Sequence, residues 1–143
     1  MSDAARNDEM ERILPPVNPL TAPYWQAARE HRFVLPRCSD CKRFHFYPRS
    51  VCPHCRSTDL VWEAASGAGE VYSYTVVHRA PSPTFAQTAP YIVAIVALRE
   101  GPHMMTRLDG VEPRAVRIGM RVHVDFDDAS DTVSLPVFRP ENS

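Results

Sequence analysis

Four cysteines in two close pairs constrain the fold of this chain more than any other feature. They follow a C-x2-C-x10-C-x2-C pattern formed by Cys38, Cys41, Cys52 and Cys55. Each C-x2-C turn can aim two thiolates at one ion, and two such turns together supply a tetrahedron of sulfur ligands. We therefore predict a closed structural metal site with all four cysteines as ligands and no position left for a substrate.

Zinc is the expected ion, although tetrahedral sulfur also holds iron, as in rubredoxins. Residues 31–62 carry six basic and two acidic side chains, a net charge of +4. Four thiolates around a divalent ion leave a charge of −2, which nearby cations can offset. Those cations are Arg37, Lys42, Arg43 and Arg56. Two histidines, His45 and His54, lie near the cysteines, but four thiols already complete the site.

The composition favours a small globular protein. The 143 residues are 44% hydrophobic and 23% charged, which is enough to bury a core without disulfides. No apolar run approaches the roughly 18 residues of a membrane-spanning helix, so we expect no membrane association. The N-terminal residues are polar and charged, unlike a secretory signal peptide. We expect a cytoplasmic protein with reduced cysteines.

One helix and several short strands are predicted from the remaining pattern. Thr21 as N-cap, Pro23 in the first turn and good helix formers up to Arg32 predict a helix, with Tyr24, Trp25 and Ala28 on its apolar face. Around the cysteines, short strands are predicted at residues 33–35, 44–47 and 60–62. Later strands are predicted at residues 70–78, 91–98, 103–108, 120–126 and 132–138, with an acidic turn at 127–131. These five strands suggest a small closed or sandwiched β-domain.

The motifs of a catalytic centre are missing from the sequence. It contains no phosphate-binding glycine loop, no G-x-S-x-G and no H-E-x-x-H. Once the four cysteines hold a metal, no cysteine nucleophile remains. His78, His103 and His123 fall at scattered positions on predicted strands. We expect that the chain is not itself an enzyme.

A series of motifs in a fixed order carries a family resemblance. An aromatic helix leads into the first cysteine pair (residues 18–41), and the second pair lies in PRSVCPHC (48–55). Strand-like segments follow as SGAGEVYSYTVVHR (66–79), PYIVAIVALREG (90–101), IGMRVHVDF (118–126) and LPVFRP (135–140). This set resembles the small zinc-ribbon plus OB-fold proteins that accompany thiolases and other acyl-CoA enzymes. The chain departs from the family at Lys42 and Arg56, where a glycine commonly relieves strained backbone.

The resemblance implies a mainly β protein in three parts. These are a flexible arm and N-terminal helix (1–31), a rubredoxin-like zinc ribbon (32–63) and a five-stranded OB-fold barrel (64–143). It also implies a non-catalytic accessory subunit that docks on a thiolase, a thiolase-like aldolase or a hydratase. Such a subunit supports the folding of its partner and the binding of acyl-CoA.

Five residues are candidates for contact with the partner or with CoA. Arg43, Phe46 and Tyr47 lie in a basic and aromatic segment between the cysteine pairs. Arg79 and Phe85 lie in the loop that joins the first two barrel strands, where OB folds often bind ligands. The arginines suit the phosphates of CoA. Phe85, an apolar residue in a polar loop, suits a pocket on a partner.

Two other functions are weighed against this hypothesis. Zinc ribbons and OB folds also bind nucleic acids, but residues 63–143 carry a net charge of −3 and the sequence pI is about 6.6. Both values disfavour binding to the negatively charged phosphate backbone of a nucleic acid. Rubredoxin-like electron transfer through iron would leave most of the chain without a role.

Overall fold

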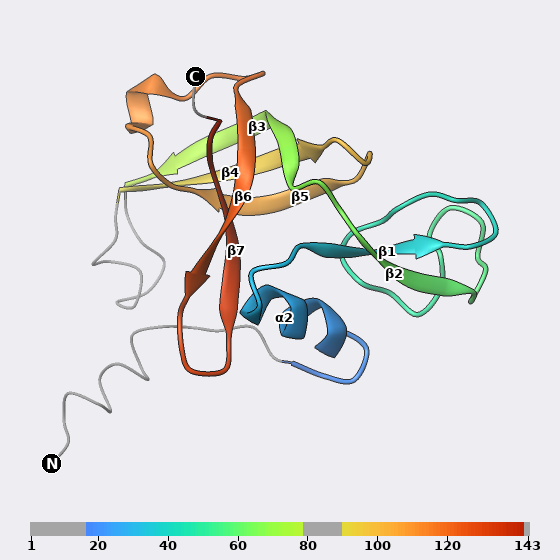
Figure 1. Cartoon of the computed structure of the whole chain (residues 1–143). Helices are drawn as coiled ribbons and strands as arrows, with labels where there is room; N and C mark the ends of the chain where they lie inside the picture. Colours follow the sequence, from blue (N-terminus) through green and yellow to red (C-terminus); the bar gives the residue numbers. More distant parts are fainter. Residues whose placement is uncertain (1–16, 79–89, 142–143) are drawn as a thin grey trace, which may run out of the picture.

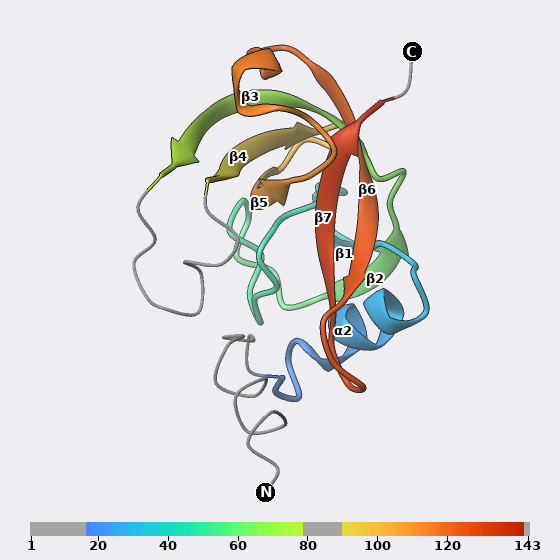
Figure 2. The same cartoon turned by 90° about the vertical axis from the view of Figure 1, so that its left-hand side faces the viewer.

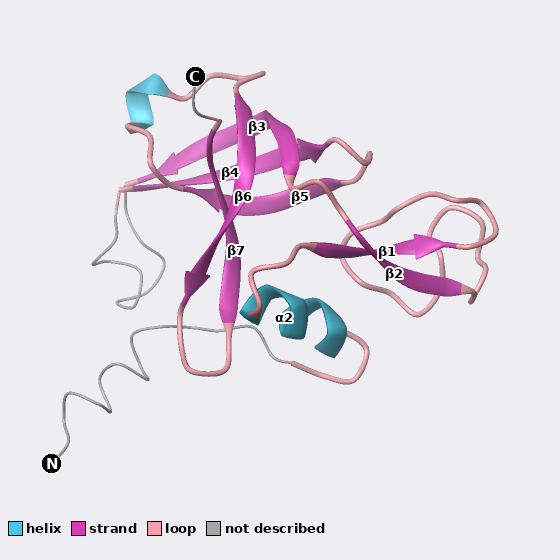
Figure 3. Ribbon diagram, viewed as in Figure 1, coloured by secondary structure: helices cyan, strands magenta, loops and turns pink. Residues whose placement is uncertain are grey.

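The described part of the chain folds as one α-helix, a two-stranded ribbon and a five-stranded barrel with a short 3-10 helix (Figures 1 and 3). A computed structural model describes residues 17–78 and 90–141. Its elements, in chain order, are α2 (Ala22–Arg29), β1 (Val34–Cys38), β2 (Leu60–Ala64), β3 (Ala68–Val77), β4 (Tyr91–Leu98), β5 (His103–Leu108), the 3-10 helix η1 (Pro113–Ala115), β6 (Arg121–Asp128) and β7 (Ser134–Pro140). The predicted fold class, mainly β with an N-terminal helix, is confirmed. Within the described residues, no helix has the length and apolar character needed to cross a membrane.

Helix α2 begins at the predicted N-cap but is shorter than predicted. Thr21 occupies the N-cap position, although its hydroxyl contacts the Asn18 side chain at 3.2 Å instead of capping the helix. The apolar face is confirmed, because Tyr24, Trp25 and Ala28 are all buried. The helix ends at Arg29, and His31 follows with a positive φ of 59°.

Strands β1 and β2 form the ribbon. They pair antiparallel, from Val34 opposite Ala64 to Cys38 opposite Leu60. The predicted strand at residues 44–47 is wrong, since its pairing is limited to one isolated bridge between Phe44 and Arg37. Phe46 instead packs on the helix, with its ring centroid 5.7 Å from that of Tyr24. Phe46 and Tyr47 therefore pack on the helix through Tyr24, whereas Phe44 lies beneath the guanidinium of Arg37.

The barrel closes in the strand order β3-β4-β5-β7-β6, which is the order of an OB fold. Neighbouring strands are antiparallel except β5 and β7, which are parallel and meet at one pair, Leu108 and Phe138. Strands β4 and β5 have the predicted bounds. Strand β6 extends into the predicted acidic turn, because Asp127 and Asp128 pair with β7.

Strand β3 contains a β-bulge. Val71 pairs with Val96 and Ser73 pairs with Ile95, so Tyr72 is an extra residue between two consecutive pairs. The two strands that pair with β3 do so over different lengths. Strand β6 pairs only with residues 68–70, whereas β4 pairs with β3 as far as Val77.

Buried aromatic side chains connect the three parts of the chain. The ring of Phe33, just before β1, lies 6.5 Å from that of Tyr24 on α2 and 6.2 Å from that of Phe138 on β7. Phe138 itself is completely buried in the barrel core. Figure 1 shows α2 beside the lower ends of β6 and β7. The helix and the start of the ribbon therefore share one hydrophobic core with the barrel.

Candidate metal centre

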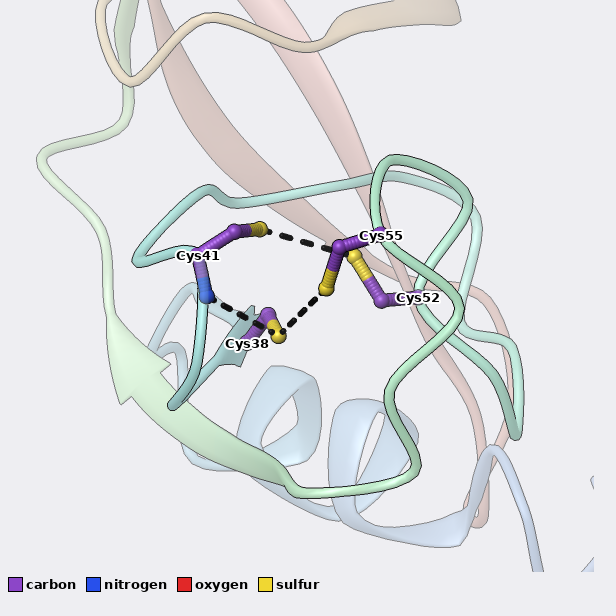
Figure 4. A group of neighbouring side chains, drawn as sticks. All are labelled: Cys38, Cys41, Cys52 and Cys55. Atoms are coloured by element: carbon purple, nitrogen blue, oxygen red, sulfur yellow. Dashed lines mark hydrogen bonds between the residues drawn. The ribbon is translucent and has the colours of Figure 1, made fainter.

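The four cysteine sulfurs converge at one point between the two C-x2-C turns (Figure 4). The Sγ atoms of Cys38 and Cys55 are 3.5 Å apart, and those of Cys41 and Cys52 are 3.7 Å apart. Sulfurs at the corners of a tetrahedron with Zn–S bonds of about 2.3 Å are about 3.8 Å apart, whereas a disulfide bond measures about 2.05 Å. The separations fit four ligands of a single ion.

The two cysteine turns have matching backbone geometry. In each turn the residue after the second cysteine donates its N–H to the carbonyl of the first cysteine, at 2.9 Å for both Lys42 and Arg56. These two residues also share a positive φ of 69°. These two non-glycine residues therefore adopt a region of φ that favours glycine.

Backbone N–H groups point at the sulfurs of Cys38 and Cys52 and favour their thiolate forms, whereas at Cys55 the backbone N–H of Ser57 is outweighed by the neighbouring cysteines and by burial, which raise the pKa of that thiol. The N–H of Cys41 lies 3.5 Å from the Sγ of Cys38 and lowers the pKa of Cys38 to about 7. Burial opposes ionisation of Cys52, but the N–H groups of Cys55 and His54 outweigh it and lower the pKa of that thiol. Thiolates are the form that binds metal, so the backbone prepares the site for a divalent cation.

The donor set suits a structural zinc ion. All four ligands are thiolates from the protein, which leaves no open coordination position for water or a substrate. The nearby histidines lie outside this sulfur cluster. The Nε2 atom of His54 is 3.3 Å from the carbonyl oxygen of Phe44. His45 is buried, and burial lowers its pKa, with smaller contributions from His54 and Arg49.

The cations predicted to offset the thiolate charge divide into two groups. Arg37 is engaged, since it donates to Glu63 at 2.9 Å and lies over the ring of Phe44 at 5.2 Å. Lys42, Arg43 and Arg56 are exposed, and within the described residues no carboxylate pairs with them. Their charge is therefore presented to solvent beside the metal site.

The candidate contact residues occupy different environments. Arg43 is exposed and Tyr47 is 39% exposed, so both reach the surface of the ribbon. Phe46 is half-buried against Tyr24, and its ring is 5.2 Å from that of Tyr47. Arg79 and Phe85 lie outside the described residues.

Among the exposed apolar residues of the barrel, Tyr72 and Met105 were not predicted from the sequence. Tyr72 is 57% exposed and Met105 is 68% exposed. A signal for Met105 was present, because the alternation of residues 103–108 places it on the opposite face from buried Met104 and Thr106. Tyr72 gave no such signal, since a bulge breaks the alternation.

Comparison with known proteins identifies both parts of the chain. Residues 25–61 match the family model "ChsH2, rubredoxin-like zinc ribbon domain", and residues 62–127 match "ChsH2, C-terminal OB-fold domain". The chain is similar to a "Probable enoyl-CoA hydratase alpha subunit" of Thermomonospora curvata, with 43% identity over 90% of this chain. It spans 40% of that longer relative.

Two further relatives are close to this chain in length. A "DUF35 domain-containing scaffold protein" of Methanocaldococcus jannaschii is 36% identical over 76% of this chain and 81% of its own length. A solved structure, "Ltp2-ChsH2(DUF35) aldolase", contains a chain that is 42% identical with a TM-score of 0.79. That match covers 89% of this chain and 98% of the other.

Proposed function

Because the chain belongs to the ChsH2 (DUF35) family of zinc-ribbon and OB-fold proteins, we propose that it is a non-catalytic accessory subunit of a thiolase-type acyl-CoA enzyme. The observation that carries this proposal is the uninterrupted match of both family domains over residues 25–127. The names of its relatives support the proposal, since one is a hydratase subunit, one is a scaffold protein and one is paired with a second protein in an aldolase.

The chemistry of the described residues supports a non-catalytic role. The four cysteine thiols converge on one closed site, so none is available as a nucleophile. A structural zinc ion at this site supplies folding energy to the ribbon. In this proposal the partner supplies catalysis, while this chain provides a rigid surface on which the partner docks.

We further propose that Arg43 and Tyr47 face the partner or a CoA molecule bound between the two chains. Arg43 is exposed without a carboxylate partner in the described part of the chain, which suits a phosphate group. Phe46 and Tyr24 both pack on Tyr47, with ring centroids 5.2 and 6.0 Å from its own, and so support the exposed tyrosine. Arg79 and Phe85 remain predicted contacts.

Purification from the native cell tests the proposed function. The tagged full-length chain is expected to co-purify with an enzyme subunit that mass spectrometry identifies as a thiolase, a thiolase-like aldolase or an acyl-CoA hydratase. The purified chain alone is expected to turn over no acyl-CoA, and the complex is expected to be active. Recovery of the chain without any enzyme of these classes contradicts the proposal.

A further inference from the structure

The outer surface of strands β3, β4 and β5 carries an exposed apolar face. We define this β3–β5 face by Tyr72, Val93, Ile95 and Met105. In β4 every second residue is buried in the barrel, so Val93 and Ile95 point outward. Met105 pairs with Ile95 across β4 and β5 and therefore lies beside it on the same face. Tyr72 and Met105 are the most exposed members.

Two charged side chains border this face. Exposed Glu70 stands near one end. Arg107 pairs with Val93 across β4 and β5, and it is held by Asp109 at 2.8 Å and Asp127 at 3.0 Å. Between Glu70 and Arg107 no Lys, Arg, Asp or Glu points outward from the described strands β3, β4 and β5. Polar side chains do lie there, since Ser73 pairs with Ile95 and the ring of His103 is 4.4 Å from that of Tyr72. An apolar centre rich in Tyr and Met, with a polar rim, is typical of a protein–protein interface.

A strand edge borders the β3–β5 face. Beyond Val71 the side of β3 away from β4 has no strand partner among the described residues, because β6 pairs only with residues 68–70. Soluble proteins usually protect such an edge with lysine, proline or a short strand. Residues 71–77, VYSYTVV, contain no charge and no proline. Figure 2 shows β3 curving along the side of the barrel away from α2.

We propose that the β3–β5 face, together with the free edge of β3, is the surface on which the partner enzyme subunit docks. This inference rests on the proposed function and adds the location of the interface. The occupant is a protein surface that is apolar and uncharged at its centre and that offers extended backbone to the edge of β3.

Three observations favour this occupant over other ligands. A nucleic acid or the phosphates of CoA would need free cations, but the one arginine of this face is held by two aspartates. The α2 helix and the start of the ribbon already contact the barrel elsewhere, through Phe33 and Phe138. The solved relative with 42% identity pairs its chain with a second protein.

A charge introduced into this face tests the inference. Met105→Glu places a carboxylate at the centre of the face, and Val61→Glu makes the same change at a 44% exposed valine on ribbon strand β2. Each variant is co-expressed with the partner identified from the native cell. Wild type and Val61→Glu are expected to retain the partner, whereas Met105→Glu is expected to lose at least about tenfold in recovered complex. Metal content and melting temperature of the free chains should be alike.

Two further measurements keep the result interpretable. Amide hydrogen exchange at residues 72–77 is expected to slow when the partner binds, which is a direct sign that the strand edge is covered. Tyr72→Ser provides a second variant on the same face if Met105→Glu lowers the melting temperature. It is expected to weaken the complex as well.

The possible failures are distinct. If the wild-type chain captures no acyl-CoA enzyme, the proposed function fails and this inference fails with it. If wild type, Met105→Glu and Tyr72→Ser capture the partner equally, the docking face is wrong and the proposed function stands. If the free chain is a dimer by light scattering and Met105→Glu splits it, the occupant is a second copy and the inference is overturned.

Discussion

At the scale of single residues, Lys42 and Arg56 combine an unfavourable backbone conformation with a favourable positive charge. Both hold a φ of 69° that lets their N–H groups reach back to a cysteine carbonyl. A side chain in this conformation costs roughly 1–2 kcal/mol relative to ordinary backbone. In return, each places a cation beside thiolates that carry net negative charge.

Substitution of Lys42 separates the backbone effect from the charge effect. Lys42→Val is expected to lower the free energy of unfolding by about 1–2 kcal/mol, because a β-branched residue tolerates a positive φ poorly. Lys42→Gly removes the same charge but adopts this φ freely. Its free energy of unfolding is therefore expected to be higher than that of Lys42→Val. Chemical denaturation of the zinc-loaded proteins measures the difference. Equal stability of the two variants would show that the turn does not require this conformation.

At the scale of elements, we expect the ribbon to depend on a metal ion held by its four cysteines. Cys41→Ser removes one of four sulfur ligands and is expected to lower zinc affinity and the melting temperature of the chain, since a structural zinc ion contributes folding energy. His54→Ala is the matched control, because this residue lies in a cysteine turn but outside the sulfur cluster. It is expected to keep full zinc. Metal analysis and thermal unfolding give both readouts, and a Cys41→Ser protein with full zinc would contradict the assignment.

The end of α2 is joined to the β6–β7 hairpin by a histidine and an aspartate. The His31 ring stacks on Phe126 at 5.2 Å, and its Nε2 atom lies 2.9 Å from the Oδ1 atom of Asp128. Asp128 also accepts the hydroxyl of Ser134. The Ser134 hydroxyl, and after it His31, lower the pKa of this carboxyl below its usual value.

Asp128→Asn is expected to have a pH-dependent effect on stability. A lowered pKa in the folded state means that the ionised carboxylate stabilises the fold above the unfolded pKa of about 3.9. The contribution is lost as the pH falls through the folded pKa. The difference in melting temperature between wild type and Asp128→Asn should therefore be present at pH 5 and shrink as the pH falls below about 4. A difference that grows as the pH falls from 4 to 2 would contradict this linkage.

The sequence allowed some elements to be predicted well and others poorly, for physical reasons. Strands β4 and β5 were predicted at their observed bounds because burial in the barrel imposes strong apolar patterns on residues 91–98 and 103–108. The cysteine site was predictable because ligand spacing is local. The contact of His31 with Asp128 was not predictable, since the two residues are 97 positions apart in the sequence. The bulge at Tyr72 likewise depends on the neighbouring strand.

At the scale of the whole molecule, the ribbon, helix and barrel share buried side chains. Phe33 contacts Tyr24 on one side and Phe138 on the other. The predicted division into three parts, with boundaries at residues 31/32 and 63/64, stays a prediction. The shared core indicates that these segments stabilise one another.

Phe33→Ala tests this coupling. The variant is expected to lose roughly 3–5 kcal/mol of stability, because a buried aromatic side chain is removed from a close-packed core. Wild-type protein is expected to unfold in one calorimetric transition with equal calorimetric and van't Hoff enthalpies. Zinc removal should lower the temperature of that whole transition. Two separate transitions, with only one sensitive to zinc, would show that ribbon and barrel unfold independently.

The β-bulge in β3 also determines which single-codon deletions the gene can tolerate in this strand. Val71 and Ser73 already pair with consecutive residues of β4, so loss of the Tyr72 codon leaves every rung of the ladder in register. Loss of the neighbouring Tyr74 codon would either turn the following residues to the opposite side of the sheet or, if the bulge is lost, move Ser73 into the place of Tyr74. Natural length variation within this strand is therefore expected to concentrate at Tyr72.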